Sequence, residues 1–210
     1  MNGYFPVFLD LTARSCVVVG GGPVAERKIR GLLDAGAIVT VVAPDVTPAV
    51  AVLAEQGTIA HVARRYRAGD LAAHRLAFVA TDDPDVTAAV ADEAREWNIW
   101  VNAADDASQS DFILPSVLKR GRLTVAVGTG GASPALARLV REEIEAVVDD
   151  DYAELVDVAA DVRHELRQRG RASTGDAWIR GVDTDVRRLI REGRRAEARA
   201  RLLARLEAEP

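Results

Sequence analysis

Glycines between an apolar run and a helical pattern give this sequence its clearest chemical signal. Residues 17–19 are valines, and Gly20, Gly22 and Ala25 follow them with the spacing G-x-G-x-x-A. In this pattern the first glycine allows a tight turn, the second lets the backbone approach a pyrophosphate, and the alanine lets helix and strand pack closely. The N–H groups at the start of the helix attract the phosphate charge. The pattern therefore predicts a dinucleotide-binding turn, and a plain glycine turn is the alternative.

The choice between NAD and NADP depends on the end of the second strand. An acidic residue is expected there, about 20 residues after the glycines, to bind the ribose hydroxyls. The sequence has Ala43 and Pro44 at this place, followed by Asp45. No arginine is adjacent to Asp45 to hold a 2′-phosphate, which favours NAD. An ordinary turn is the alternative interpretation of Asp45.

Polar residues also follow two later apolar runs. Thr81 and Asp82 come after residues 76–80, and Asn102 is followed three residues later by Asp105, with Asp106 beside it. Open parallel sheets bind ligands at the carboxyl ends of their strands. A carboxylate there can act as a general base, and a like charge beside it raises its pKa. We expect cofactor contacts from Thr81 and Asp82; a solvated polar turn is the alternative for 102–106.

A second glycine pair precedes another helical pattern. Gly130 and Gly131 are followed by Ser133 as the expected N-cap, by Pro134 in the first turn, and by Arg138 on the helix. Successive backbone N–H groups and a helix N-terminus both attract carboxylate or phosphate groups. The segment is therefore a candidate anion site, and a strand-to-helix connector is an equally good interpretation.

These groups must be positioned by alternating strands and helices, which are typical of a parallel sheet covered by helices. We expect strands at residues 15–19, 38–42, 58–63, 76–80 and 99–102. We expect helices at residues 24–33, ending near Gly36, and at 84–96, with Asp83 as N-cap.

After residue 102 this alternation stops. Residues 112–118 and 123–127 predict a hairpin, and the helix after Ser133 is expected to reach about residue 148. The last 62 residues hold 14 acids and 13 arginines and predict two or three helices broken around residues 170–175. We therefore expect domains at 1–111, 112–148 and 149–210. The basic stretch 187–205 reads as a solvated helix face, with binding of substrate carboxylates as the alternative.

Composition excludes several protein classes. The chain has 210 residues, of which 49% are hydrophobic and 28% charged, as in soluble globular proteins. A net charge of -5 argues against nucleic acid as a partner. The single cysteine, Cys16, excludes an internal disulfide, and one cysteine with three histidines predicts no metal cluster. Without a leader or a long apolar segment, we expect a cytoplasmic protein with no membrane contact.

Several motifs together resemble one known family over about residues 4–148. They are FPVFLDL at 5–11, GGGPVAERK at 20–28, ATDD at 80–83, NAAD at 102–105, FILPS at 112–116 and GGASPALA at 130–137. In this order they are similar to the precorrin-2 dehydrogenase family, which is the dehydrogenase/ferrochelatase portion of siroheme synthase. The resemblance implies a Rossmann-like parallel-sheet domain, a hairpin-helix dimerisation region and a small helical C-terminal domain.

The resemblance also implies an activity. Members oxidise precorrin-2 to sirohydrochlorin with NAD as cofactor, form homodimers around the hairpin and its following helix, and in some cases insert Fe(II) to give siroheme. The family's acid/base aspartate corresponds to Asp105. The resemblance carries cofactor contacts over to Pro23, Val24, Pro44 and Asp45. Together with the positions expected from the glycine pattern and the strand ends, the expected cofactor contacts are Gly20, Gly22, Pro23, Val24, Ala43, Pro44, Asp45, Thr81, Asp82 and Asn102. Implied contacts to the substrate's carboxylates are Thr129, Gly130, Gly131, Ser133 and Arg138.

Two departures from the family and three rival functions remain. Many relatives have serines where this chain has Gly128 and Thr129, so only Thr129 keeps a hydroxyl. The methyltransferase domain of some siroheme synthases is absent, and we expect a separate methyltransferase to supply precorrin-2. The rivals are a dehydrogenase without chelatase activity, an NAD-sensing regulatory domain, and a short-chain dehydrogenase. A short-chain dehydrogenase is disfavoured because no tyrosine in the sequence has a lysine four residues later.

Overall fold

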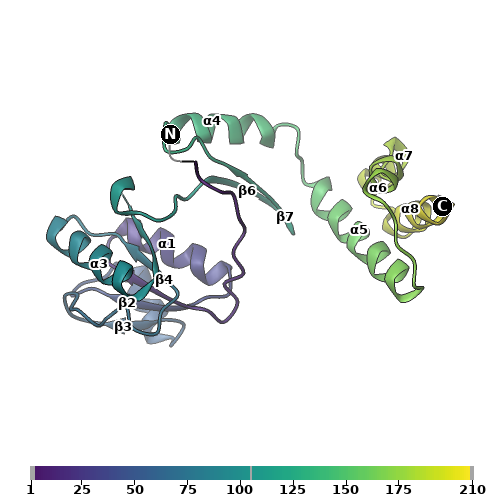
Figure 1. Ribbon diagram of the computed structural model, residues 1–210. Coiled ribbons are helices and arrows are strands. Elements are labelled where there is room, and N and C mark those ends of the chain that lie inside the picture. Colours follow the sequence, from purple (N-terminus) through teal and green to yellow (C-terminus); the bar gives the residue numbers. More distant parts are fainter. Residues whose placement is uncertain (1–2, 105, 209–210) are drawn as a thin grey trace. The chain divides into compact units, whose positions relative to one another are not determined.

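The computed structural model describes residues 3–104 and 106–208. The chain forms two compact units, one up to Leu114 and one from Pro115 onward, and Figure 1 shows the elements of each. The three domains expected at 1–111, 112–148 and 149–210 stay a prediction.

The first unit contains a parallel sheet of five strands. They are β1 (Ser15–Val19), β2 (Ile38–Val42), β3 (Ala60–Val62), β4 (Leu76–Val79) and β5 (Trp100–Ala103), in the order β3-β2-β1-β4-β5. Strand β1 lies at the centre, and its residues from Cys16 to Val19 are buried. Continuous β-branched runs suit such strands because both faces are covered. The expected Rossmann-like sheet is confirmed.

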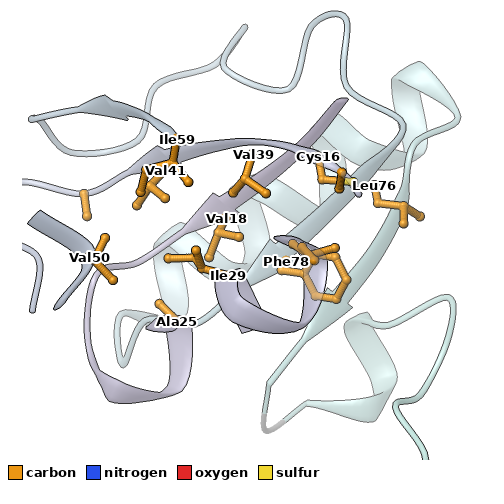
Figure 2. Close-up of a cluster of buried hydrophobic side chains, with 13 residues drawn as sticks. Cys16, Val18, Ala25, Ile29, Val39, Val41, Val50, Ile59, Leu76 and Phe78 are labelled. Atoms are coloured by element: carbon orange, nitrogen blue, oxygen red, sulfur yellow. The ribbon is translucent and has the colours of Figure 1, made fainter. Parts of the chain in front are cut away.

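Helices cover both faces of this sheet. They are α1 (Pro23–Asp34), α2 (Pro48–Glu55) and α3 (Pro84–Trp97), and a short 3₁₀ helix, η1 (Ala107–Gln109), follows β5. Figure 2 shows the core under α1 and α2, where Ile29 of α1 packs towards Val18 and Phe78 of the sheet. Val90 and Ala94 of α3 join a second buried cluster on the opposite face.

The boundaries of these helices follow from local chemistry. Helix α1 ends as expected, because Gly36 has a positive φ of 75° and its N–H donates to the carbonyl oxygen of Leu33. Asp83 caps α3 by accepting hydrogen bonds from the N–H groups of Asp85 and Val86. Helix α2 was not expected from the sequence, although Thr47 caps it and Pro48 begins it.

The second unit begins with an antiparallel hairpin of β6 (Ser116–Arg120) and β7 (Leu123–Val127). The strand expected at 112–118 therefore begins four residues late, at Ser116. The helices are α4 (Pro134–Glu145), α5 (Asp151–Gln168), α6 (Gly175–Gly181), α7 (Thr184–Arg191) and α8 (Arg195–Ala208). From α5 onward the described chain contains four helices, so the expectation of two or three is wrong. Two extra breaks, around residues 182–183 and 192–194, divide the charged tail.

Arginines of the tail meet carboxylates of their own unit. Arg195 of α8 lies 2.7 Å from Glu154 and 2.8 Å from Asp161, both on α5. Arg201 and Arg205 of α8 pair with Asp185 and Asp183 at the start of α7. The basic stretch 187–205 is therefore matched by acids within the unit, which weakens its interpretation as a site for substrate carboxylates.

In the residues that the structure describes, no helix combines the length and apolar character that crossing a membrane requires.

Candidate cofactor and active site

The turn after β1 is shaped by two close backbone approaches. A β-carbon at Gly20 would lie 2.0 Å from the carbonyl oxygen of Ala80, and Gly20 has a φ of 124°. A β-carbon at Gly21 would lie 2.0 Å from the carbonyl oxygen of Asp45. Both positions therefore require glycine for packing. The sequence pattern pointed to Gly20 but gave no role to Gly21.

Gly22 differs from its two neighbours. A β-carbon there would meet nothing within 4 Å, so the space beside it is open. Gly22 is also the N-cap of α1 and offers no side-chain hydrogen bond to the helix, while Pro23 occupies the first turn and Val24 is exposed. An open space at an uncapped helix N-terminus fits the pyrophosphate of a dinucleotide.

The loop after β2 packs onto this turn. The N–H of Thr47 donates to the carbonyl oxygen of Gly21 over 2.9 Å. The Thr47 hydroxyl donates to Glu26 over 2.7 Å, and this bond, with a second from Arg30, holds the pKa of Glu26 below its usual range. The carbonyl oxygen of Ala43, after β2, contacts Nε2 of His61 at 2.9 Å. This network fixes the loop that was expected to carry the ribose contacts.

Of the three predicted residues in that loop, Ala43 is buried, whereas Pro44 and Asp45 are exposed. Within the described part of the chain, the Asp45 carboxylate makes no hydrogen bond or ion pair. It is therefore available to accept hydrogen bonds from ribose hydroxyls.

The carboxyl ends of β4 and β5 enclose an open pocket of about 310 Å³. Thr81, Asp82, Thr87, Ala104, Asp106 and Gln109 are among its lining residues. The sheet thus brings Thr81 and Asp82 next to the segment that follows β5. The Thr81 oxygen accepts a hydrogen bond from the N–H of Asp83 over 3.3 Å, which fixes this corner of the pocket.

Of the two adjacent aspartates after β5, the structure describes only Asp106. Asp106 caps η1, and its Oδ1 accepts hydrogen bonds from the Ser108 hydroxyl at 2.6 Å and the Ser108 N–H at 2.9 Å. These bonds hold the pKa of Asp106 below its usual range, so it stays ionised. Asp105, the expected acid/base residue, lies outside the described residues.

The segment that follows β5 is anchored where it returns to the strand. Val101 N–H donates to the Asp111 carboxylate over 2.9 Å, and Asp111 N–H donates back to the Val101 carbonyl oxygen over 2.8 Å. Ala103 N–H donates to the Ser110 hydroxyl over 2.9 Å. Sequence reasoning missed Ser110 and Asp111, although a short polar side chain soon after a strand is a usual signal for such a bond.

Asn102 lies between Val101 and Ala103 on β5, so its side chain points to the opposite face of the strand from theirs. In the parallel register it is paired with Phe78 of β4. Its Oδ1 accepts a hydrogen bond from Nζ of Lys28 over 2.8 Å, and its Nδ2 donates to the carbonyl oxygen of Phe112 over 2.9 Å. Only 6% of Asn102 is exposed. Its predicted contact with the cofactor stays a prediction, and Lys28 is a partner that the sequence did not indicate.

The second glycine pair belongs to the second unit. Gly130 and Gly131 have positive φ values of 63° and 84°. The Thr129 hydroxyl accepts from the N–H of Ser133 and donates to its carbonyl oxygen. Ser133 caps α4 as expected, accepting from the N–H of Leu136. Both hydroxyls therefore shape the loop, and their predicted contacts with substrate stay predictions.

Arg138 lies on the first turns of α4 with 75% of its side chain exposed. Its Nε is 2.8 Å from Oε1 of Glu142, one turn later. An arriving carboxylate would therefore compete with Glu142 for this guanidinium. Within the described residues, no group of three or more histidines, cysteines or carboxylates could hold a metal ion.

Two family models match the sequence. Residues 7–116 match a family described as "Putative NAD(P)-binding", and residues 120–146 match one described as "Sirohaem biosynthesis protein central". The first match confirms the prediction of a nicotinamide dinucleotide as cofactor.

Curated relatives carry the name siroheme synthase. The protein of Chromobacterium violaceum is 39% identical over 98% of this chain, and that of Methylococcus capsulatus is 40% identical over 98%. A siroheme synthase of Nitrosomonas europaea is 43% identical over 79% of this chain. This chain spans 44% of the first two relatives and 35% of the third, less than half their length.

A solved structure has a similar fold over nearly the whole chain. It is "SirC, precorrin-2 dehydrogenase", with a TM-score of 0.76 and 29% sequence identity. The alignment covers 94% of this chain and 99% of that one.

Proposed function

The chain belongs to the family described as "Putative NAD(P)-binding", and from this premise we propose that it oxidises precorrin-2 to sirohydrochlorin with NAD. The observation that carries the proposal is the alignment with precorrin-2 dehydrogenase, which spans 99% of that enzyme at 29% identity. The open space beside Gly22 in the cofactor turn supports the use of NAD in this reaction.

The residues at the sheet edge suit this cofactor. The backbone at Gly22 and the uncapped start of α1 hold the pyrophosphate, and Asp45 accepts hydrogen bonds from the ribose. Thr81 and Asp82 line the pocket beyond the ends of β4 and β5, where the nicotinamide end is expected. When bound, NAD supplies the acceptor for a hydride.

Asp105 is the proposed acid/base residue. Oxidation of precorrin-2 removes one hydride and one proton, and a carboxylate near the reacting carbon framework takes the proton. Its neighbour Asp106 caps η1 through Ser108, which assigns that carboxylate to holding the loop. A single base is therefore proposed for the reaction.

The substrate's acetate and propionate groups need cationic or N–H partners. We assign these to the loop from Thr129 to Ser133, where the exposed Gly130 and Gly131 have positive φ ahead of α4, and to Arg138. We further propose that a separate methyltransferase supplies precorrin-2 and that the reaction takes place in the cytoplasm.

A homodimer is part of the proposal. The second unit exposes large apolar side chains on the hairpin and on α4, including Val117 at 43%, Leu136 at 49% and Leu139 at 52%. Large apolar side chains that are exposed on neighbouring elements favour association. Light scattering of the purified protein tests this, and a monomer at micromolar concentration would contradict it.

An anaerobic assay tests the activity. Purified protein is mixed with precorrin-2 and NAD, and NADH formation is followed together with the absorption spectrum of sirohydrochlorin. NADH and sirohydrochlorin in equal amounts support the dehydrogenase. NAD binding without turnover would instead support an NAD-sensing regulatory domain.

Fe(II) insertion is tested in the same vessel. Fe(II) is added after the oxidation is complete, and the rate of siroheme formation is compared with that in a sample without protein. Acceleration by the protein assigns chelatase activity. An equal rate of siroheme formation with and without the protein would indicate a dehydrogenase that has no chelatase activity.

A further inference from the structure

We propose that Lys28 is a positioning residue of this dehydrogenase. Its ammonium group orients the Asn102 amide, and this amide secures the segment that carries Asp105. The inference rests on the proposed function and adds a residue whose role lies outside the cofactor turn and the acid/base group.

Lys28 lies one turn into α1, the helix that starts at the cofactor turn. Its Nζ donates to Oδ1 of Asn102 over 2.8 Å and lies 5.4 Å from the centre of the Phe78 ring. A hydrogen bond from a charged donor is stronger than one between neutral groups. The aromatic ring adds a favourable contact for the cation. The ammonium is therefore held between helix and sheet.

The bond and the Phe112 carbonyl oxygen together fix which way the Asn102 amide faces. Because an ammonium group only donates, Oδ1 must point to Lys28, and Nδ2 then points to the carbonyl oxygen of Phe112, 2.9 Å away. Asn102 is 6% exposed, so water is a poor substitute for either partner. Without Lys28 the amide loses the charged one of the two partners that hold this orientation.

The Phe112 carbonyl is one of three places where the returning chain is tied to β5. The others are the bonds of Val101 to Asp111 and of Ala103 to Ser110. These ties join residues 101–103 to residues 110–112, which lie on either side of Asp105 in the sequence. Catalytic groups lose much of their effect when they are displaced by about 1 Å. Loss of one tie is therefore expected to reduce turnover rather than cofactor binding.

The residue type at position 28 supports this role. Lys28 and Lys119 are the only lysines, and all other basic side chains apart from three histidines are arginines. An arginine presents a broad planar fork, whereas a lysine offers a compact charge on a thin stem. A compact group suits the space between the Asn102 amide and the Phe78 ring.

The test compares three variants of the full chain. Lys28→Met removes the charge and keeps the length, Lys28→Arg keeps a charged donor, and Arg27→Met removes an exposed cation from the preceding position of α1. We measure NAD affinity by calorimetry, steady-state kinetics with precorrin-2, and hydrogen exchange of the peptide covering residues 101–112.

In Lys28→Met we expect kcat to fall by about 10- to 100-fold, with NAD affinity and the KM for NAD nearly unchanged. Exchange in residues 101–112 should accelerate by about tenfold, whereas exchange in β1 and β2 stays as in the wild type. Lys28→Arg keeps the charge in a bulkier group and should recover kcat only in part, and Arg27→Met should behave as the wild type.

Several results would overturn the proposal. Unchanged kcat and unchanged exchange in Lys28→Met would show that Asn102 needs no charged donor. Faster exchange throughout the first unit, with kcat and NAD affinity falling together, would make Lys28 a residue of general stability. Should Lys28→Met not fold, Lys28→Gln takes its place, and full turnover in that variant contradicts the proposal.

The proposed function is tested separately by the wild type. If the wild-type protein binds NAD but does not oxidise precorrin-2, the proposed function is wrong. The exchange experiment then decides on Lys28 alone: local acceleration in residues 101–112 supports the positioning role, and no change contradicts it.

Discussion

The end of β4 determines the residue type at the start of the cofactor turn, because a β-carbon on Gly20 would lie 2.0 Å from the carbonyl oxygen of Ala80. The 124° φ of Gly20 also disfavours any side chain. We expect Gly20→Ala to lower the free energy of unfolding by more than about 2 kcal/mol. Urea unfolding measures this. A loss below about 0.5 kcal/mol would show that the strands can separate to admit the methyl group.

Gly22→Asp should preserve the stability of the fold and abolish NAD binding. A β-carbon there meets nothing within 4 Å, so the fold and the melting temperature should be preserved. The new carboxylate would occupy the space proposed for the pyrophosphate and repel its charge. We expect calorimetric titration to detect no NAD binding. Wild-type affinity for NAD in this variant would move the pyrophosphate site elsewhere.

Asp105→Asn keeps the size of the side chain but cannot accept the proton. Turnover of precorrin-2 should fall by on the order of 100-fold or more, with NAD affinity retained. Asp106→Asn is the matched control, because asparagine can still cap η1 at Ser108 and should leave turnover close to that of the wild type. An inactive Asp106→Asn beside an active Asp105→Asn would transfer the role to Asp106.

Arg138→Ala tests the proposed contact with the substrate's carboxylates. Because the side chain is 75% exposed and already pairs with Glu142, we expect only about a tenfold loss in kcat/KM for precorrin-2. NAD affinity should not change, and added salt should narrow the difference.

The same variant needs a control for assembly. Arg138 lies on α4, near the exposed Leu136 and Leu139 that are proposed to face a second copy. Light scattering must show the wild-type oligomeric state before the kinetics are interpreted. If Arg138→Ala keeps the wild-type oligomeric state and the wild-type kcat/KM for precorrin-2, segment 129–134 only connects β7 to α4 and does not bind substrate.

Cys16 offers a test of burial that involves pH. The thiol is fully buried, and desolvation raises its pKa to about 11. At about pH 8 only about one thiol in a thousand is then ionised in the folded protein, and the thiolate is the reactive form. A thiol reagent should therefore modify the native protein far more slowly than the urea-unfolded chain. Equal rates would show that β1 opens readily.

The sequence predicted strands well where β-branched runs are buried on both faces. Strands β1 and β2 of the first unit begin and end at the expected residues. Strand β7 does so too, although its residues are only partly buried or exposed. The strand expected from residue 112 fails because Phe112 uses its carbonyl oxygen for Asn102, and Pro115 lacks an N–H group to pair with a neighbouring strand. Helix α2 was missed because a short valine- and alanine-rich run has no clear helical period.

The candidate site was predicted in part for a similar reason. Gly20 and Gly22 belong to a glycine pattern directly after the first strand, and Asp45 comes shortly after the second strand. These positions can be recognised in the sequence alone, so the sequence was sufficient to select the three residues. Lys28 was not selected, because its partner Asn102 is 74 residues away and only the sheet order brings them together. Gly21 was given no role, because its need for glycine comes from the backbone of Asp45.

The central place of β1 affects how the protein is made on the ribosome. Cys16 pairs with Leu76, so one edge of β1 has no native partner until 60 further residues have been synthesised. At about 5 to 20 residues per second this takes about 3 to 12 seconds. During this time the nascent strand, with its valines and its only thiol, is open to chaperones and oxidants that never reach it in the finished protein.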